Sequence, residues 1–158
     1  MFSVGDKIAH PLHGAGVIEG LETKTVGGVS REYYVMNPPF GQMRVLIPTD
    51  SVEAVGVRPV IDRSEAEALL ASLPELECEM TQNWNKRYRE NMLRIRSGDL
   101  MEVARVIKGL FQRDRERGLS TGERKMLRSA KRILISELVL VQDGSYEEIE
   151  KKIDAALV

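Results

Sequence analysis

The first third of the chain alternates short apolar runs with turn residues, a pattern typical of small β-rich domains. Residues 17–24, 31–36 and 42–47 are rich in aliphatic, aromatic and β-branched residues, and glycine or proline separates them. Residues 7–10 form a further short run, and residues 52–57 can add a fifth strand. Several short strands joined by Gly- and Pro-containing turns predict a small Tudor-like or SH3-like barrel.

From residue 59 onward the apolar positions follow the period of amphipathic helices. Residues 62–73 carry acids in the first turn and stop at Pro74, as a helix does. Apolar residues three and four positions apart then form one stripe from Leu100 to Phe111 and another from Met126 to Leu138. Such stripes predict helices that pack around a common core.

Helix starts are marked by a short polar residue followed three positions later by glutamate, the spacing of a capping box. The pairs are Asp99 with Glu102, Ser120 with Glu123, and Ser145 with Glu148. Gly118 marks the end of the first of these helices, and Asp143 with Gly144 marks the end of the second. Together with residues 62–73 and 83–96, these signals predict four to five helices.

Arg58-Pro59 separates the two patterns, because proline pushes the residue before it into an extended conformation. The sequence therefore predicts an α+β protein of two domains. Residues 1–58 form a small N-terminal Tudor/SH3-like β-barrel, and residues 59–158 form a compact all-α domain.

Charge is distributed unevenly along the chain, although the formal net charge is only −1. Residues 83–133 carry a net charge of +9, whereas the flanking residues 59–82 and 134–158 carry −5 and −4. A basic block of this kind points to an anionic partner, usually a nucleic acid. A solvated helix surface is the alternative explanation.

The basic block opens with residues 83–96, which hold the only tryptophan, Trp84. Its helical spacing with Tyr88 and Ile95 predicts a core position. Its place at the start of the helix instead allows it to project beside a surface that contacts phosphates. The nearest basic residues are Lys86, Arg87 and Arg89. An aromatic side chain among cations can grip a nucleic-acid backbone and probe its bases, so both interpretations stay open.

Candidate catalytic chemistry is sparse. His10 and His13 have no third metal ligand at useful spacing, which predicts turn histidines. Gly14-Ala15-Gly16 lacks the Gly-Lys-Ser/Thr of a phosphate loop and opens a strand, so we expect its glycines to shape a tight turn. Two glutamates flank Cys78 and should raise its thiol pKa, which argues against a nucleophile. We therefore expect neither catalysis, a metal, a cofactor nor a small-molecule substrate.

No apolar run approaches the roughly 20 residues of a membrane span, and the N-terminus has no signal-peptide pattern. A single cysteine excludes an intramolecular disulfide and suits a reducing compartment. The sequence predicts a cytoplasmic protein without a membrane partner.

Three motifs are specific enough to suggest a family. They are VGDKIAHPLHGAG at residues 4–16, NWNKRY at residues 83–88 and RDRERGLSTGER at residues 113–124. Together they resemble the CarD/CdnL family of bacterial RNA polymerase-binding transcription regulators, and the resemblance covers essentially the whole chain. It implies an N-terminal module similar to the polymerase-interacting domain of transcription-repair coupling factors, which binds the RNA polymerase β subunit.

The resemblance also implies that the helical domain contacts promoter DNA at the upstream edge of the transcription bubble. Trp84 matches the residue that wedges into the minor groove there and keeps the open complex from collapsing. By position, the residues that would contact the DNA backbone are Lys86, Arg87, Arg89 and Arg124, with Lys125 as a neighbouring candidate.

On the polymerase side, Lys24 matches a basic position of the family's β-binding face. A second basic position is occupied here by Leu46, and Arg44 could replace it, because residues two apart on a strand share a face. An alternative is that the module pairs an exposed strand edge, residues 31–36 or 42–47 and thus Ile47, with a polymerase strand. We expect a non-catalytic regulator that stabilises the open complex; the alternative is a protein-interaction adaptor without direct DNA contact.

Overall fold

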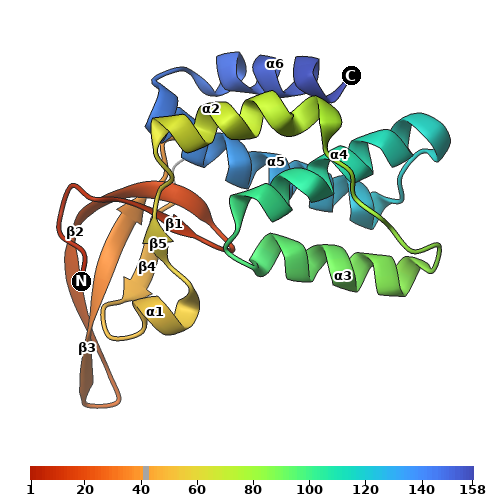
Figure 1. Ribbon diagram of the computed structural model, residues 1–158. Coiled ribbons are helices and arrows are strands. Elements are labelled where there is room, and N and C mark those ends of the chain that lie inside the picture. The colour runs from red at the N-terminus through yellow and green to blue at the C-terminus, as the bar shows by residue number, and fades with distance from the viewer. Residues whose placement is uncertain (41–42) are drawn as a thin grey trace.

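The computed structural model describes residues 1–40 and 43–158. Five strands form one antiparallel sheet in the order β4-β3-β2-β1-β5 (Figure 1). The strands are β1 (Lys7–His10), β2 (Gly14–Val26), β3 (Val29–Asn37), β4 (Val45–Pro48) and β5 (Arg58–Pro59). The predicted α+β class and the N-terminal β domain are thus confirmed.

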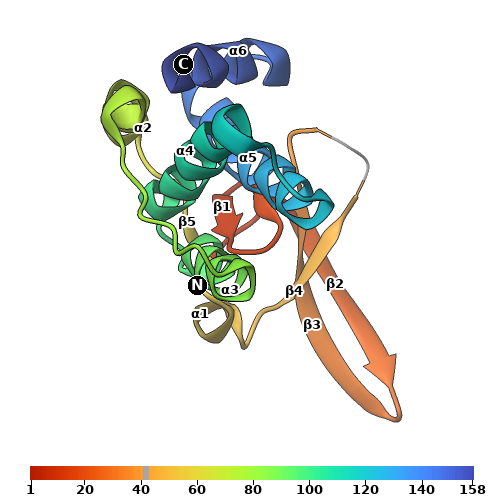
Figure 2. The same ribbon diagram turned by 90° about the vertical axis from the view of Figure 1, so that its right-hand side faces the viewer.

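Strands β2 and β3 form a long hairpin whose tip extends beyond the rest of the sheet. Gly27 and Gly28 at the tip both have positive φ, 59° and 79°, which suits a two-residue hairpin turn. The tip points away from the helices in both views (Figures 1 and 2). The predicted turn at these glycines is confirmed.

Two predicted strands differ in the structure. Val52–Val55 forms a short helix, α1, which ends at Gly56 with φ 93°, so the prediction of a strand over residues 52–57 is wrong. The fifth strand is instead β5, which pairs with β1. The predicted domain boundary, between residues 58 and 59, therefore falls inside this strand. The strand predicted over 42–47 appears as β4, while its first residue, Gln42, lies outside the described residues.

Five further helices form the C-terminal part. They are α2 (Arg63–Ser72), α3 (Trp84–Arg96), α4 (Leu100–Arg117), α5 (Thr121–Gln142) and α6 (Tyr146–Leu157), with a 3₁₀ turn, η1 (Leu73–Glu75), after α2. In both views α3 and α6 lie on opposite sides of the central pair α4 and α5 (Figures 1 and 2). None of the helices in the described ranges combines the length and apolar character needed to cross a membrane.

The predicted helix starts are confirmed, since Asp99, Ser120 and Ser145 each accept a hydrogen bond from a backbone N–H of the following turn. The reciprocal glutamate contact that would complete a capping box is found at none of these three helix starts; Glu102, for example, pairs with Arg105 instead of reaching back to Asp99. A complete capping box forms at α2, between Asp62 and Glu65.

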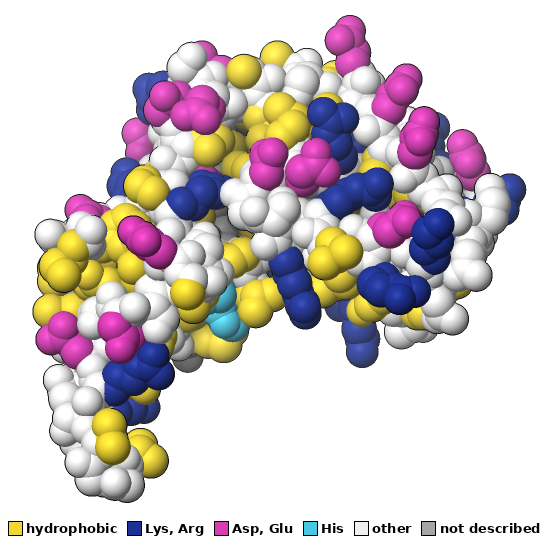
Figure 3. All heavy atoms as spheres, turned by 60° about the horizontal axis from the view of Figure 1, so that its bottom comes forward, with side chains coloured by type: hydrophobic (Ala, Val, Ile, Leu, Met, Phe, Trp, Pro, Cys, Tyr) yellow, Lys and Arg dark blue, Asp and Glu magenta, His cyan; other side chains and the backbone are white. Residues whose placement is uncertain are grey.

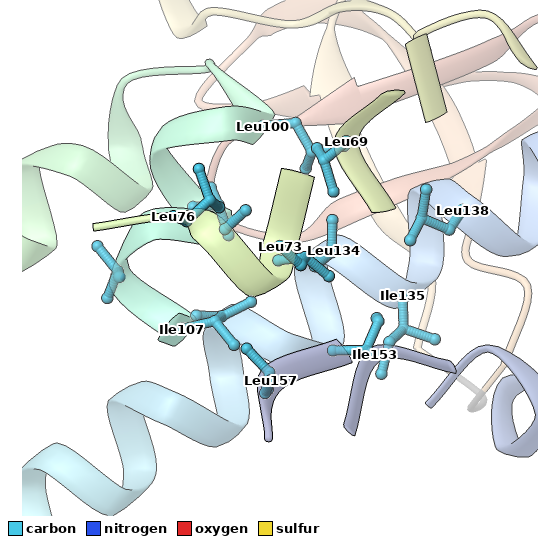
Figure 4. Close-up of a cluster of buried hydrophobic side chains, with 14 of the residues drawn as sticks. Leu69, Leu73, Leu76, Leu100, Ile107, Leu134, Ile135, Leu138, Ile153 and Leu157 are labelled. Atoms are coloured by element: carbon cyan, nitrogen blue, oxygen red, sulfur yellow. The ribbon is translucent and has the colours of Figure 1, made fainter. Parts of the chain in front are cut away.

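The described residues form two hydrophobic cores. The larger joins all five C-terminal helices, and the predicted stripes of α4 and α5 supply many of its residues, including Ile107, Leu134 and Leu138 (Figure 4). The smaller lies in the sheet around Ile18 and Met36. Separate cores support the predicted division into two domains, although the exact boundary stays a prediction.

The sheet packs closely against α5. A Cβ atom at Gly14 would lie 2.5 Å from Ser136 Oγ, so this glycine permits the close approach. The backbone N–H of Ala15 donates to the same Ser136 Oγ at 2.8 Å. At Gly16 a Cβ would lie 2.6 Å from the carbonyl oxygen of Asn37. The glycines of this motif therefore let β2 approach both α5 and β3.

Candidate nucleic-acid interface

Trp84 is the first residue of α3 and lies at the surface. Asn83 starts the helix by accepting a hydrogen bond from the backbone N–H of Lys86 at 3.0 Å. The Trp84 residue is 42% exposed and belongs to neither hydrophobic core. The prediction of a core position for this tryptophan is therefore wrong, and its surface position is the one observed.

The exposed indole is nevertheless held in a defined orientation. Its ring stacks on Tyr88, with centroids 5.1 Å apart and an interplanar angle of 19°. Its Nε1–H donates to Ser120 Oγ at 3.1 Å. Tyr88 is half-buried and packs against the helical core, so it supports the indole from below. A fixed, half-exposed aromatic ring is suited to stack on another flat surface.

Ser120 also begins α5, and it brings the N-termini of two helices together. Its hydroxyl accepts from the backbone N–H of Glu123 at 3.2 Å while it accepts from the Trp84 indole. A Cβ atom at Gly122, in the first turn of α5, would lie 3.5 Å from the Trp84 ring, so the indole passes close to this turn. Helix N-termini present free N–H groups and partial positive charge, which favour anions such as phosphate.

A buried ion pair lies beneath this surface. Arg87 Nε and Nη2 donate to the two carboxylate oxygens of Glu123 at 2.9 and 3.3 Å, and Nη1 donates to the carbonyl oxygens of Thr81 and Gln82. Both side chains of the pair are only 3% exposed. The prediction that Arg87 contacts a DNA backbone is corrected by this geometry, because its guanidinium joins α3 to α5 below the surface.

The Glu123 carboxyl is charged in this environment. Burial acts to raise its pKa, but the hydrogen bonds and positive charge of Arg87 outweigh burial, and Arg113 and Ser120 add to their effect. The pKa of Glu123 is therefore lowered, which keeps the ion pair intact at neutral pH.

The other predicted DNA-contacting cations are exposed on α3 and α5, the two helices whose N-termini meet at Trp84 and Ser120. Lys86 and Arg89 stand on α3, and Arg124 and Lys125 stand on the first turns of α5. No ion pair in residues 1–40 and 43–158 involves any of these four side chains. On the face to which α3 belongs, Lys and Arg side chains gather over the helical part (Figure 3). We call Trp84 with these four cations the Trp84 corner.

The predicted polymerase-contacting residues lie in the sheet domain, remote from the Trp84 corner. Lys24 is exposed on β2 opposite Arg31 of β3, and Arg31 pairs with Asp50 at 3.0 Å. Arg44 precedes β4 and pairs with Glu22 at 3.1 Å and Glu19 at 3.5 Å. Its charge is thus partly neutralised by the chain's own acids.

Leu46 and Ile47 lie on β4, which forms one edge of the sheet. Leu46 is half-buried, whereas Ile47 is 1% exposed and belongs to the core of the sheet. The Ile47 side chain is therefore not available to a partner, which corrects a side-chain role for it. The backbone of β4 pairs with β3 alone among the described strands, so its other edge is open for pairing.

The histidines and the cysteine have structural surroundings. His10 is buried, its Nδ1 accepts from the backbone N–H of Leu12 at 3.0 Å, and burial with the nearby His13 lowers its pKa to about 4. The pKa of Cys78 is raised as predicted, but burial is the main cause. No cluster of three or more metal-ligating His, Cys, Asp or Glu side chains occurs in the part of the chain that the structure describes.

The sequence identified Trp84 and the nearby cations as candidates, but it did not indicate which residues hold the indole in place. Ser120 was expected to start a helix, yet its contact with the indole was not expected. Glu123 was expected to complete a capping box, whereas its carboxylate binds Arg87. The sequence signal at this place is the short spacing of Gly118, Ser120 and Glu123, which indicates a helix start. It does not indicate that α3 packs beside that helix start.

Comparison with known proteins covers both parts of the chain. Residues 2–61 match the CarD-like/TRCF RID domain, and residues 68–154 match the CarD C-terminal domain. A Bacillus subtilis (strain 168) protein named "Putative transcription factor YdeB" is 33% identical over 150 residues, covering 95% of this chain and 98% of that protein. The matches place a TRCF RID-like domain before the helical domain. The chain therefore belongs to the CarD family of transcription factors.

Proposed function

We propose that this protein acts by binding, without catalysis, as a cytoplasmic regulator of transcription. In this proposal the sheet domain, residues 1–58, binds the β subunit of RNA polymerase. The helical domain, residues 59–158, binds promoter DNA at the upstream edge of the bubble and stabilises the open complex. Membership of the CarD family supports the regulatory role, and the match to a TRCF RID-like domain supports a polymerase partner.

The observation that carries the DNA part of the proposal is the exposed, oriented Trp84 indole, with four exposed cations on the two helices that meet there. Exposed Lys and Arg side chains contact phosphates without reading sequence. An aromatic wedge separates stacked bases at a cost of roughly a few kcal/mol, which is least where the duplex is already opening. Lys86, Arg89, Arg124 and Lys125 would hold the backbone while Trp84 contacts the bases at the fork.

The polymerase part of the proposal rests on the sheet edge and on Lys24. Strand β4 offers unpaired backbone groups to a partner strand, with Leu46 at the middle of the edge. Lys24 is exposed on the projecting hairpin. Arg44 contributes less in this proposal, because Glu19 and Glu22 already pair with it. Tethering to polymerase would raise the local protein concentration at promoters to about the millimolar range.

The test is the lifetime of the promoter open complex with Trp84→Ala. We expect this variant to shorten the lifetime while its affinity for polymerase is unchanged. Leu93→Ala is the matched control, because Leu93 is also an exposed apolar residue of α3, at 66% exposure, and lies outside the Trp84 corner. An unchanged lifetime for Trp84→Ala would remove the wedge role and favour an adaptor that meets only proteins.

A further inference from the structure

A second ion pair, with a buried carboxylate, joins the two domains at the opposite end of α3 from Trp84. Arg58 of β5 donates through Nη1 and Nη2 to the two carboxylate oxygens of Glu137 of α5, at 2.7 and 2.9 Å. The Glu137 side chain is 1% exposed and that of Arg58 is 28% exposed. Glu137 is thus sealed inside the contact between sheet and helices.

Each member of the pair makes further contacts across the junction. Glu137 also accepts from the backbone N–H of Ile61 at 2.8 Å, in the segment that connects the domains. Arg58 Nε donates to the carbonyl oxygen of Gly98 at 2.7 Å, in the turn between α3 and α4. A single arginine of the sheet therefore contacts α5 directly and also binds the turn that follows α3.

Directional contacts of this kind restrict the angle between the two domains more than they add to the stability of the fold. A buried ion pair is often no more stabilising than apolar side chains of similar size, because both charges lose hydration. Paired guanidinium and carboxylate groups, however, require one relative orientation. Two further polar contacts cross the same junction: Ala15 N–H to Ser136 Oγ, and Lys7 Nζ to the carbonyl oxygen of Leu140 at 2.9 Å.

The position of the indole depends on the angle at this junction, because α3 lies between the two. Its 13 residues separate Trp84 from the turn that Arg58 holds, a length of about 20 Å. A rotation of about 10° at the junction would move the indole by about 3 Å, which is close to the rise of one base pair, about 3.4 Å. A loose junction would therefore place the indole at the wrong base step.

We infer that the Arg58–Glu137 ion pair is a positioning device that fixes the helical domain on the sheet domain. It sets where Trp84 meets DNA when the sheet is bound to polymerase. This inference rests on the proposed function for its consequence in transcription. The fixed orientation itself is a property of the free protein and can be measured without DNA or polymerase.

The first test measures the distance distribution between nitroxide labels at Glu53 and Lys151, which are exposed in the sheet and helical domains. Labels are attached to introduced cysteines in a Cys78→Ala background. The main variant replaces both partners, Arg58→Met with Glu137→Met, so that no charge is left buried alone. Arg63→Met is the control, because it breaks an exposed pair with Asp143 within the helical domain.

We expect a narrow distribution in the parent and in the control, and a clearly broader one in the double variant. A double variant as narrow as the parent would overturn the inference. The single variant Arg58→Lys should give a distribution of intermediate width. Lysine keeps the charge but cannot bind both carboxylate oxygens in the same planar fashion.

The second test measures open-complex lifetime with the double variant. We expect a lifetime shorter by about tenfold, since a loosened tether lowers the effective concentration of Trp84 at the fork. Affinities for polymerase and for duplex DNA should each stay within about twofold, because both binding faces remain folded. Loss of either affinity, or a broad distribution with an unchanged lifetime, would contradict a positioning role. A failure of Trp84→Ala to shorten the lifetime would instead refute the proposed function and leave the distance result standing.

Discussion

The Trp84 corner and the β4 edge differ in what they leave free for a partner. At the corner, Arg87 and Glu123 neutralise each other below the surface, and Lys86, Arg89, Arg124 and Lys125 have no partner among the described residues. In the sheet domain, Arg31 and Arg44 are paired with the chain's own acids, and the open feature is the backbone of an edge strand.

This difference predicts two kinds of recognition in one small protein. Free cations attract a polyanion over a distance and respond strongly to salt. A strand edge binds through short-range hydrogen bonds and shape, which respond weakly to salt. The same residue type, arginine, is thus structural at position 87, neutralised at position 44 and available at position 124.

Removing Arg87 should have the largest effect on stability. Arg87→Ala leaves the Glu123 carboxylate buried without its partner, which typically costs about 3–5 kcal/mol. Urea unfolding of the variant measures the free energy of unfolding. Arg89→Ala is the control, since Arg89 is exposed on the same helix and should change stability by less than about 0.5 kcal/mol. Equal effects of the two substitutions would contradict a buried structural role for Arg87.

Acid should weaken the sheet domain before it weakens the Trp84 corner. The pKa of His10 falls from 6.5 to about 4 on folding, so the unfolded chain binds more protons between these pH values. Stability is therefore lost as the pH falls from 6.5 towards 4, by about 3 kcal/mol in total. Glu123 has a lowered pKa, so its contribution persists above its ordinary value of 4.5 and is lost only below it.

Unfolding free energies measured from pH 7 to pH 4 provide the comparison, with His10→Gln as the test variant. This variant should remove most of the loss between pH 6.5 and 4. A parent protein whose stability is flat across that range would show that His10 does not titrate as its buried position requires.

Salt should separate the two binding faces. With four phosphate contacts at the Trp84 corner, raising salt from 50 to 200 mM should weaken DNA binding by about a hundredfold. Lys125→Ala should lower the slope of log K against log salt by about 0.9. Lys151→Ala, an exposed lysine of α6 on the other side of the helical domain, is the control and should leave the slope unchanged. A salt response of polymerase binding as steep as that of DNA binding would break the contrast.

The smallest effect is expected at Lys24. Because Lys24 is an exposed cation, Lys24→Ala should lower affinity for the polymerase β subunit by up to about 1 kcal/mol, or about fivefold, and should leave DNA affinity unchanged. Titration of the β subunit by each variant measures this directly. A loss of DNA affinity with unchanged affinity for the β subunit would show that Lys24 contacts DNA and not polymerase.

The sequence predicted the elements because local signals determine them. Caps at Asn83, Asp99 and Ser120 start helices wherever these helices later pack, and their apolar stripes indicate the buried faces. The Val52–Val55 error arose because two valines within four residues resemble a strand. Gly56, with its left-handed backbone, instead ends a single helical turn there.

The site could be predicted only in part, because burial depends on partners that are distant in sequence. In the sequence, Arg87 and Arg89 are the same residue type with similar basic neighbours. Arg87 is buried because Glu123, 36 positions later, faces it from another helix. Trp84 likewise fitted both a core stripe and a surface wedge until Ser120 and Tyr88 showed how an exposed indole is held.

Contact between position 84 and the upstream fork can be measured by replacing Trp84 with a photoactivatable phenylalanine derivative and irradiating the open promoter complex. We expect crosslinks to DNA at the upstream edge of the bubble, at one or two neighbouring positions. The same derivative at Leu93, exposed on α3 outside the Trp84 corner, should give far fewer crosslinks to those positions. Crosslinks from position 84 to polymerase alone, or no preference over position 93, would show that Trp84 does not contact DNA at the fork.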